Sequence, residues 1–283
     1  SVWEGDCGGR GVIGERGERV LVDGDRMPGA QWFPDAKLNF ARNLLRSRDA
    51  HDAIVFWGED RVMKRMSHGE LYRAVAHFVA ALREMGVKKG DRVAAYMPNM
   101  PETVIAMLAA TSIGAIFTSA SPDFGVQGVL DRFGQTEPKV LIACDGYYYA
   151  GKTVDVLGKL GEIVGQLPSV KRVVVVPYVH HDHDLSHVPH ARMYADFIAP
   201  YHFVDDIEFA ELPFDHPLYI MYSSGTTGVP KCIVHCAGGA LLQHLKEHKL
   251  HGDVKPADRV FYFTTCGWMM WNWLVSALAA EAT

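Results

Sequence analysis

Apolar residues recur along this 283-residue chain with two alternating periods, one typical of helices and one typical of strands. The clearest helix should begin at Ser67, because Ser67 and Glu70 have the spacing of a capping box. Gly86 can end this helix in a left-handed conformation. Its apolar face should pack in the core and comprises Leu71, Val75, Phe78, Val79, Leu82 and Met85. Shorter helices are predicted at residues 38–45, 101–113, 125–133, 154–167 and 193–197.

Extended segments are predicted between these helices, at residues 53–56, 92–97, 115–120, 140–143 and 173–176. The four consecutive valines at 173–176 are typical of a strand buried on both faces of a parallel sheet. Strands that alternate with helices predict an α/β fold. A polar stretch then separates this part from a second α/β run that begins at Leu218, so we expect a subdomain boundary near residues 178–217.

Composition narrows the class of protein. Hydrophobic residues make up 48% of the chain and charged residues 22%, which is the balance of a globular protein. The net charge of -5 leaves no basic stripe for nucleic acid, and no apolar stretch has the roughly 20 residues of a membrane span. The apolar residues 268–280 are better read as a buried helix. Five scattered cysteines favour a reducing compartment, and we expect a cytoplasmic location.

Two stretches invite a metal-site interpretation. Cys232, His235 and Cys236 are close in sequence, but no second ligand pair follows at a usual spacing. The histidine-rich residues 180–190 form a polar, irregular tract interrupted by Pro189, which is more typical of a solvated loop with weak, incidental metal affinity. We therefore predict no metal ligand in this chain.

The strongest chemical signal follows a predicted buried strand at residues 218–222. It is the loop Ser223-Ser224-Gly225-Thr226-Thr227-Gly228-Val229-Pro230-Lys231. Glycines let backbone N–H groups approach an anion, hydroxyls donate further hydrogen bonds, and Lys231 adds a charge on a chain stiffened by Pro230. A flexible linker rarely follows a strand and ends in Pro-Lys, and the Gly-Lys-Ser/Thr ending of a Walker A loop is missing. The pattern predicts a phosphate-binding loop.

This loop resembles the nucleotide-binding signature of the adenylate-forming superfamily, which includes acyl-CoA synthetases. The resemblance extends along nearly the whole chain: residues 66–72, 115–122 and 261–273 are similar to further family motifs. Residues 31–40 are similar to the N-terminal signature of the acetyl- and acetoacetyl-CoA synthetase branch. Residues 230–235 and 264–272 look most like the acetoacetate–CoA ligases of that branch.

The resemblance implies the N-terminal part of the large domain of the adenylate-forming fold, with mixed or parallel sheets flanked by helices. Residues 1–52 would form the branch's N-terminal region and residues 53–283 an incomplete AMP-binding domain. It implies a ligase of lipid and ketone-body metabolism that uses ATP, Mg²⁺ and coenzyme A. A carboxylate, here acetoacetate, would attack ATP to give an acyl-adenylate, from which the coenzyme A thiol displaces AMP. The alternatives are a ligase for acetate or propionate, and a non-catalytic nucleotide-binding module.

The resemblance also assigns roles to individual residues. The β- and γ-phosphates would be held by Ser223, Ser224, Gly225, Thr226, Thr227, Gly228 and Lys231. Catalytic roles would fall to Lys231, Thr227 and Trp268, the last as a gating aromatic between the acyl pocket and the coenzyme A tunnel. Met269, Met270 and Trp271 would either line the acyl pocket or fill the core. His235 would pack beneath the loop, with a structural role at least as well supported as a catalytic one.

The family's remaining functional groups lie downstream of the positions that this sequence covers. They are the magnesium-binding glutamate, the ribose-binding aspartate, the hinge, and the mobile C-terminal domain with its catalytic lysine. We therefore expect that the chain alone does not complete the reaction, and that the missing C-terminal part of the same enzyme is its partner. Cys236 and Glu281 stand where similar proteins usually carry glycine, and Glu281 places a charge at a packed turn.

Overall fold

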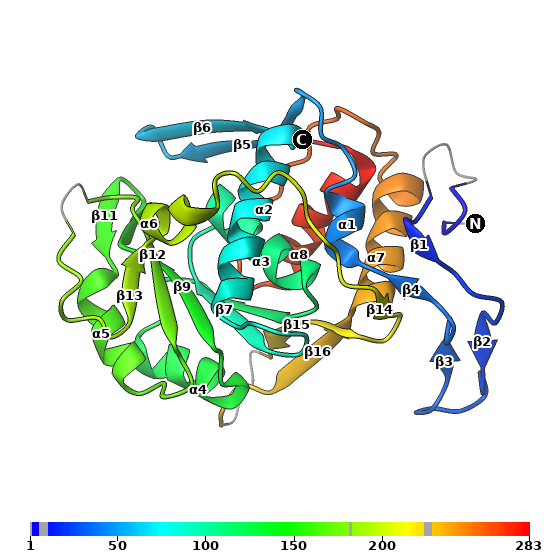
Figure 1. Ribbon diagram of the computed structural model, residues 1–283, viewed down its shortest axis with the longest axis horizontal. Helices are drawn as coiled ribbons and strands as arrows, with labels where there is room; N and C mark the ends of the chain where they lie inside the picture. The colour runs from blue at the N-terminus through cyan, green and yellow to red at the C-terminus, as the bar shows by residue number, and fades with distance from the viewer. Residues whose placement is uncertain (1, 6–10, 181–182, 224–227) are drawn as a thin grey trace.

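A seven-stranded sheet forms the centre of the molecule in a computed structural model that describes residues 2–5, 11–180, 183–223 and 228–283 (Figure 1). The strand order is β13 (Ala191–Met193), β12 (Arg172–Val176), β9 (Val140–Cys144), β7 (Arg92–Tyr96), β8 (Ile116–Ala120), β15 (Pro217–Tyr222) and β16 (Cys232–Cys236). Every neighbouring pair is parallel except β15 and β16, which are antiparallel. The α/β prediction is confirmed, and the valines of β12 are buried between β9 and β13 as expected.

The crossovers between strands place helices on both faces of this sheet. Helix α3 (Pro101–Ser112) leads from β7 to its neighbour β8, and α4 (Val126–Thr136) leads from β8 back past β7 to β9. Because parallel crossovers are right-handed, connections that run in opposite directions lie on opposite faces. Helices α2 (His68–Glu84) and α6 (Tyr194–Ile198) pack with the α3 side, and α5 (Leu157–Gly165) packs against α4. The carboxyl ends of β7 and β8 therefore form a topological switch point, where open α/β sheets bind ligands.

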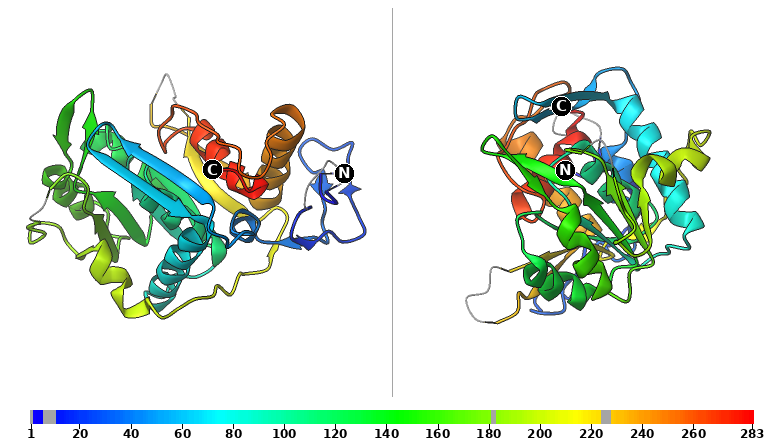
Figure 2. Two further views of the ribbon diagram at one scale, coloured as in Figure 1. Left: turned by 90° about the horizontal axis from the view of Figure 1, so that it is seen from above. Right: turned by 90° about the vertical axis from the view of Figure 1, so that its left-hand side faces the viewer.

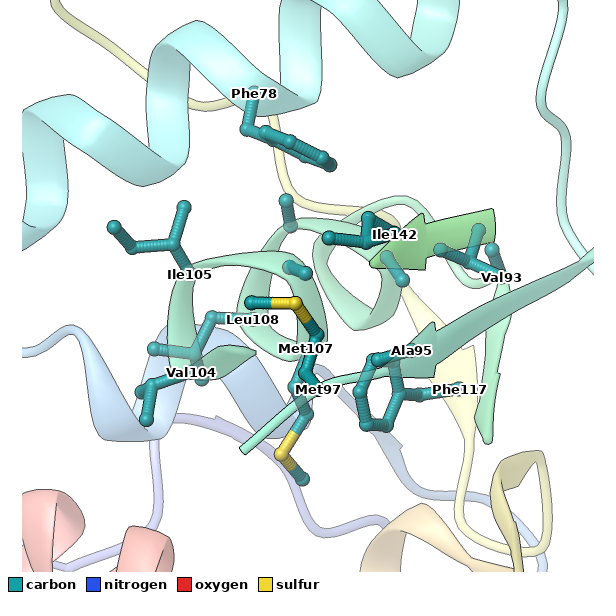
Figure 3. Packing of buried hydrophobic residues seen from close by; sticks show 14 of the residues in the cluster. Phe78, Val93, Ala95, Met97, Val104, Ile105, Met107, Leu108, Phe117 and Ile142 are labelled. Atoms are coloured by element: carbon teal, nitrogen blue, oxygen red, sulfur yellow. The ribbon is translucent and has the colours of Figure 1, made fainter. Parts of the chain in front are cut away.

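Helix α2 begins and ends where its sequence signals predict. The Ser67 Oγ accepts the Glu70 backbone N–H at 3.2 Å, and the Glu70 carboxylate accepts the Ser67 N–H at 2.8 Å, which completes the capping box. Gly86 has φ +70°, a left-handed conformation that is strained for other residues. In Figure 3, Phe78 points from α2 toward Ile142 of β9 and the side chains of α3, so the predicted apolar face packs in the core.

Several short elements were not predicted or differ from their predicted bounds. Antiparallel hairpins outside the central sheet include β5 (Asp52–Gly58) with β6 (Val62–Ser67), and β10 (Gly146–Tyr149) with β11 (Lys152–Asp155). The helix predicted at residues 154–167 was therefore placed too early, because residues 154 and 155 pair with β10 and α5 begins only at Leu157. Cross-strand pairing supplies hydrogen bonds that the local helical periodicity does not reveal.

The N-terminal part lies beside α7 (Ala237–Lys246), at the opposite end of the molecule from β10 and β11 (Figures 1 and 2). Its short strands are β1 (Gly14–Glu15), β4 (Lys37–Leu38) and β14 (Leu212–Pro213) in one sheet, and β2 (Leu21–Val22) and β3 (Gln31–Trp32) in another. Helix α1 (Phe40–Leu44) follows, and the 3-10 helix η1 (Ala199–Tyr201) extends α6. The subdomain boundary near residues 178–217 stays a prediction, and strands from both sides of it share the central sheet.

The last residues fold as helices, as predicted for 268–280. Helix α7 continues into the π-helix η2 (Glu247–His251), and α8 (Met269–Val275) continues into the 3-10 helix η3 (Ser276–Ala280). Glu281 then has φ +62°, so the position where similar proteins carry glycine is left-handed here. Phe261 and Phe263 are 84% and 85% exposed, which leaves an apolar surface beside this end of the described chain. In the part of the chain that the structure describes, no helix is long and apolar enough to cross a membrane.

The histidine-rich tract is tied to the sheet by one buried carboxylate. Asp145, at the end of β9, accepts backbone N–H groups from Tyr178, Val179 and His180 at 2.9–3.1 Å. It also contacts the His183 ring at 2.8 Å, and the His183 side chain is mostly buried, in contrast to the solvated loop that the sequence predicted. His181 and Asp182 lie outside the described residues. Asp145 is fully buried, so this tract has a structural role at that point.

Candidate functional site

Three strands of the sheet end at one edge and deliver the segments that form the site. Strands β7, β8 and β15 are mutually parallel, so Met97, Ser121 and Ser223 follow their carboxyl ends at the same edge. The connections after β7 and β8 leave toward opposite faces and open the switch point described above. The loop that β15 delivers is the predicted phosphate loop.

This loop joins the two strands of an antiparallel hairpin, which we call the phosphate hairpin (residues 217–236). Two hydrogen bonds close its base: the Ser223 N–H donates to the Lys231 carbonyl at 2.9 Å, and the Lys231 N–H donates to the Ser223 Oγ at 3.0 Å. Gly228 has φ +85°, a backbone conformation that favours glycine. Lys231 is exposed, and Ser224, Gly225, Thr226 and Thr227 lie outside the described residues. The described part of the loop thus returns to its starting strand and presents a lysine at its exit.

Helix α4 supports the strand that leaves the phosphate loop (the exit leg), and strand β8 supports the strand that enters it (the entry leg). The Gln135 side-chain amide donates to the Pro230 carbonyl at 2.8 Å, and the Cys232 thiol approaches the Gln135 Oε1 at 3.7 Å. On the entry leg, the Tyr222 hydroxyl accepts a hydrogen bond from the Thr118 Oγ1 at 2.7 Å, and burial raises the pKa of Tyr222 to about 12. Tyr222 therefore stays neutral and acts as a packed anchor directly before Ser223.

Cys266 connects the aromatic segment at residues 261–273 to the carboxyl ends of β7 and β8. The Cys266 thiol donates to the Met97 carbonyl at 2.8 Å, and the Ser119 hydroxyl donates to the Cys266 carbonyl at 2.6 Å. Burial raises the pKa of the Cys266 thiol to about 12, so this group is a poor nucleophile. A Cβ built on Gly267 would lie 3.5 Å from the backbone nitrogen of Ser121, which places Gly267 against the β8–α4 connection.

Trp268 and Trp271 have different environments at the start of α8. The Trp268 side chain is 67% exposed, and its backbone carbonyl accepts the Trp271 N–H at 3.1 Å. Trp271 is fully buried, stacks on Phe117 and donates from its Nε1 to the Asn99 Oδ1 at 2.8 Å. Trp271 therefore fills the core rather than lining an open pocket, while the exposed ring of Trp268 is free to meet a ligand.

The remaining predicted residues are half-buried. Met269 and Met270 are partly exposed on α8, beside Trp268 in sequence. His235 lies on β16 with its ring 5.3 Å from that of Tyr219, and burial lowers the pKa of His235. His235 is thus a neutral, packed histidine on the exit leg of the phosphate hairpin.

The structure brings Ser223, Gly228 and Lys231 together at one end of the hairpin and places Trp268 on the neighbouring segment. Sequence reasoning missed Gln135, which supports the phosphate loop, and Asn99, which accepts a hydrogen bond from Trp271. The signal that could have found Asn99 is its position just beyond the carboxyl end of a predicted parallel strand. Gln135 carries no such signal, because a single polar residue near the end of a helix is typical of a solvated face.

The described residues do not form a metal centre. No group of three or more histidine, cysteine, aspartate or glutamate side chains among them is placed to hold a metal ion. The described part of the phosphate loop offers the hydroxyl of Ser223 and the ammonium of Lys231, and an ammonium repels a cation. These residues do not by themselves fit a magnesium ion.

Comparisons with known proteins agree with this arrangement. The sequence profile of the family described as "AMP-binding enzyme" matches residues 40–283. The chain is 55% identical over 284 residues to the acetoacetyl-coenzyme A synthetase of Rhizobium meliloti (strain 1021) and 51% identical over 261 residues to the acetoacetyl-CoA synthetase of Gallus gallus. These alignments cover 100% and 89% of this chain but only 43% and 39% of the two relatives.

A solved structure matches as well. The acetoacetyl-CoA synthetase from Streptomyces lividans superposes with a TM-score of 0.89 at 42% identity, over 96% of this chain and 41% of that one. The shared fold thus extends over nearly all of this chain. The chain belongs to the AMP-binding enzyme family.

Proposed function

We propose that this chain supplies the phosphate-binding part of an AMP-forming acid–CoA ligase whose acid is acetoacetate. The observation that carries the proposal is the phosphate hairpin, closed at Ser223 and Lys231 at the carboxyl edge of the sheet, where the segment that carries the exposed Trp268 also packs. Relatives that carry the name acetoacetyl-CoA synthetase, at 50–55% identity, support acetoacetate over other acids. Because the chain spans about two fifths of their length, the complete activity is a proposal for the full-length protein.

The chain's own residues bind and orient the polyphosphate in this reaction. When the carboxylate attacks the α-phosphorus, negative charge accumulates on the departing pyrophosphate. The loop's N–H groups and the Lys231 ammonium would stabilise that charge as it develops. Closure of the loop base between Ser223 and Lys231 fixes where the lysine leaves the strand.

We assign the steps that involve the acid and the thiol to the residues at the start of α8. Trp268 would separate the acyl group from the entering thiol, and Met269 and Met270 would contact a small acyl chain. Methionine suits a small, partly polar group because its thioether is flexible and polarisable. ATP and coenzyme A are the proposed cosubstrates, and magnesium would be held by phosphate oxygens rather than by the described side chains. Four free cysteines among the described residues support a reducing compartment, and we place the enzyme in the cytoplasm.

One relative suggests the sharpest test of the acid. The chain is 43% identical to the malonamoyl-CoA synthetase of Penicillium aethiopicum, and malonamate differs from acetoacetate by an amino group in place of a methyl group. A site built for the methyl group leaves the amide N–H groups without partners, which is costly in a desolvated pocket. Exchange of pyrophosphate into ATP should therefore be fastest with acetoacetate and slower with malonamate, acetate and propionate. Equal rates with all four acids would contradict the assignment of acetoacetate.

The phosphate role is tested separately with Lys231→Ala in the full-length protein that contains these residues. We expect pyrophosphate exchange to fall about a hundredfold, the size seen when a preorganised electrostatic group is removed. Lys88→Ala is the matched control, because Lys88 is exposed and precedes the amino end of β7, away from the phosphate hairpin. If Lys231→Ala exchanges as fast as its parent, the ligase proposal fails. If the parent binds ATP but catalyses no exchange with any acid, the chain is a non-catalytic nucleotide-binding module.

A further inference from the structure

One arginine outside the predicted site lies where three of its segments meet. The Arg132 guanidinium, from α4, is 4.0 Å from the ring centroid of Phe124 and 5.8 Å from that of Tyr222. Phe124 belongs to the β8–α4 connection, and a Cβ built on Gly267 would be 3.9 Å from its ring. Tyr222 is the last residue before the phosphate loop. Arg132 is thus flanked by the last residue before that loop and by the β8–α4 connection.

The charge of Arg132 has no carboxylate partner in the described part of the chain. Its Nη1 donates to the Gly128 carbonyl at 2.7 Å, and the adjacent Asp131 carboxylate acts on it without forming an ion pair. The adjacent Asp131 carboxylate instead accepts a hydrogen bond from Gln127 at 2.6 Å. Burial lowers the pKa of Arg132, and this effect outweighs the opposing ones of Tyr222 and of the Asp131 carboxylate.

Two aromatic rings hold such a guanidinium but do not neutralise it. Stacking on ring faces fixes the plane of the group and leaves its edge, where the N–H donors lie, free to meet an anion. Since Arg132 is only half-buried and one of its five donors is used by Gly128, the others remain available. A planar cation with a free edge is suited to phosphate oxygens.

We propose that Arg132 is a further phosphate-recognition residue, whose charge attracts the polyphosphate that the loop at residues 223–231 binds. The rings of Phe124 and Tyr222 orient its guanidinium, and Tyr222 directly precedes the phosphate loop. This inference rests on the proposed nucleotide-binding function and extends it to α4. It predicts that Arg132 discriminates nucleotides by the number of their phosphates.

The test measures ATP and AMP affinity by equilibrium dialysis in the full-length protein that contains these residues. Arg132→Met keeps an unbranched stem of similar shape and removes the charge. We expect ATP affinity to fall about tenfold, as for the loss of a charge-assisted contact, and AMP affinity to fall only about twofold because AMP lacks the two terminal phosphates. The ATP affinity of the parent should also weaken more steeply with added salt than that of the variant.

Three variants separate this role from a structural one. Arg132→Lys restores the charge and should bind ATP within about threefold of the parent. Arg192→Met makes the same change at an exposed site on β13, at the far edge of the sheet, and should leave both affinities unchanged. Lys231→Ala reports on the phosphate loop itself.

The outcomes distinguish the two proposals. If Lys231→Ala loses ATP affinity and Arg132→Met does not, the role of Arg132 is overturned and the proposed function stands. If Arg132→Met weakens ATP and AMP equally, and Arg132→Lys does not rescue it, Arg132 is only structural. If Lys231→Ala binds ATP as its parent does, the proposed function fails and the role of Arg132 fails with it.

Discussion

Acidification should destabilise the protein through His244, a buried histidine on α7. Its side chain is almost completely buried, and its Nδ1 has no hydrogen-bond partner among the described residues. Burial, reinforced by the neighbouring His248, lowers the pKa of His244 to about 4. His248 is itself held in place, since its Nε2 donates to the Trp273 carbonyl at 2.9 Å. The nearby Glu247 carboxylate favours the charged form of His244, but its effect is smaller than that of burial.

The direction and size of the effect follow from the two pKa values. An unfolded histidine titrates near pH ~6.5, so between about pH 6.5 and 4 the unfolded chain binds a proton that the folded chain excludes. The stabilising contribution of neutral His244 is complete above that range and is lost as the pH falls through it. With a folded pKa of about 4, the loss between pH 7 and pH 5 is about 2 kcal/mol. A domain of this size is commonly stable by about 5–15 kcal/mol, so the loss is measurable.

The assay is urea unfolding at pH 7 and pH 5 for the parent and for His244→Leu, which cannot titrate. We expect the unfolding free energy of the parent to fall about 2 kcal/mol further over this interval than that of the variant. His251→Leu is the matched control, because His251 is exposed in the adjoining η2 and should leave the pH dependence unchanged. If His244→Leu keeps the full pH dependence of its parent, the reasoning from burial is refuted.

Three further predictions concern stability and specificity. Asp145→Asn should lower the unfolding free energy measured in urea by about 2–4 kcal/mol, because an amide cannot accept from three backbone N–H groups and His183 as the carboxylate does. A loss of unfolding free energy below about 0.5 kcal/mol would contradict this reasoning. Glu281→Gly should raise the unfolding free energy by about 0.5–1 kcal/mol by relieving the left-handed backbone, whereas Glu281→Ala, which keeps the Cβ, should give no gain. Trp268→Ala should leave the melting temperature nearly unchanged, since the ring is exposed. It should raise kcat/KM for a six-carbon acid, relative to that for acetoacetate, by about tenfold. An unchanged ratio of the two kcat/KM values would exclude a gating role.

Elements with strong local signals could be predicted from sequence. Helix α2 carries its own start at Ser67 and its own stop at Gly86, and the valines of β12 have a composition that few other environments accept. The hairpin of β10 and β11 could not be predicted in this way, because its strands are stabilised by each other rather than by a periodic pattern within either one.

The same distinction applies to the site. Ser223, Gly228 and Lys231 lie within one contiguous loop, so their proximity could be predicted from neighbouring residues. Their phosphate-binding roles stay predictions, as do those of the intervening Ser224, Gly225, Thr226 and Thr227. Gln135 reaches the same loop from 95 residues away. An isolated glutamine or arginine on a helix gives no indication of which strand it will meet, and the burial of Trp271 likewise depends on the distant Phe117 and Asn99.

The two strands of the phosphate hairpin differ in how many neighbouring strands they pair with. Strand β15 is hydrogen-bonded on both sides, to β8 and to β16, whereas β16 has a partner on one side only within the described chain (Figure 1). The exit leg should therefore open to solvent more readily than the entry leg.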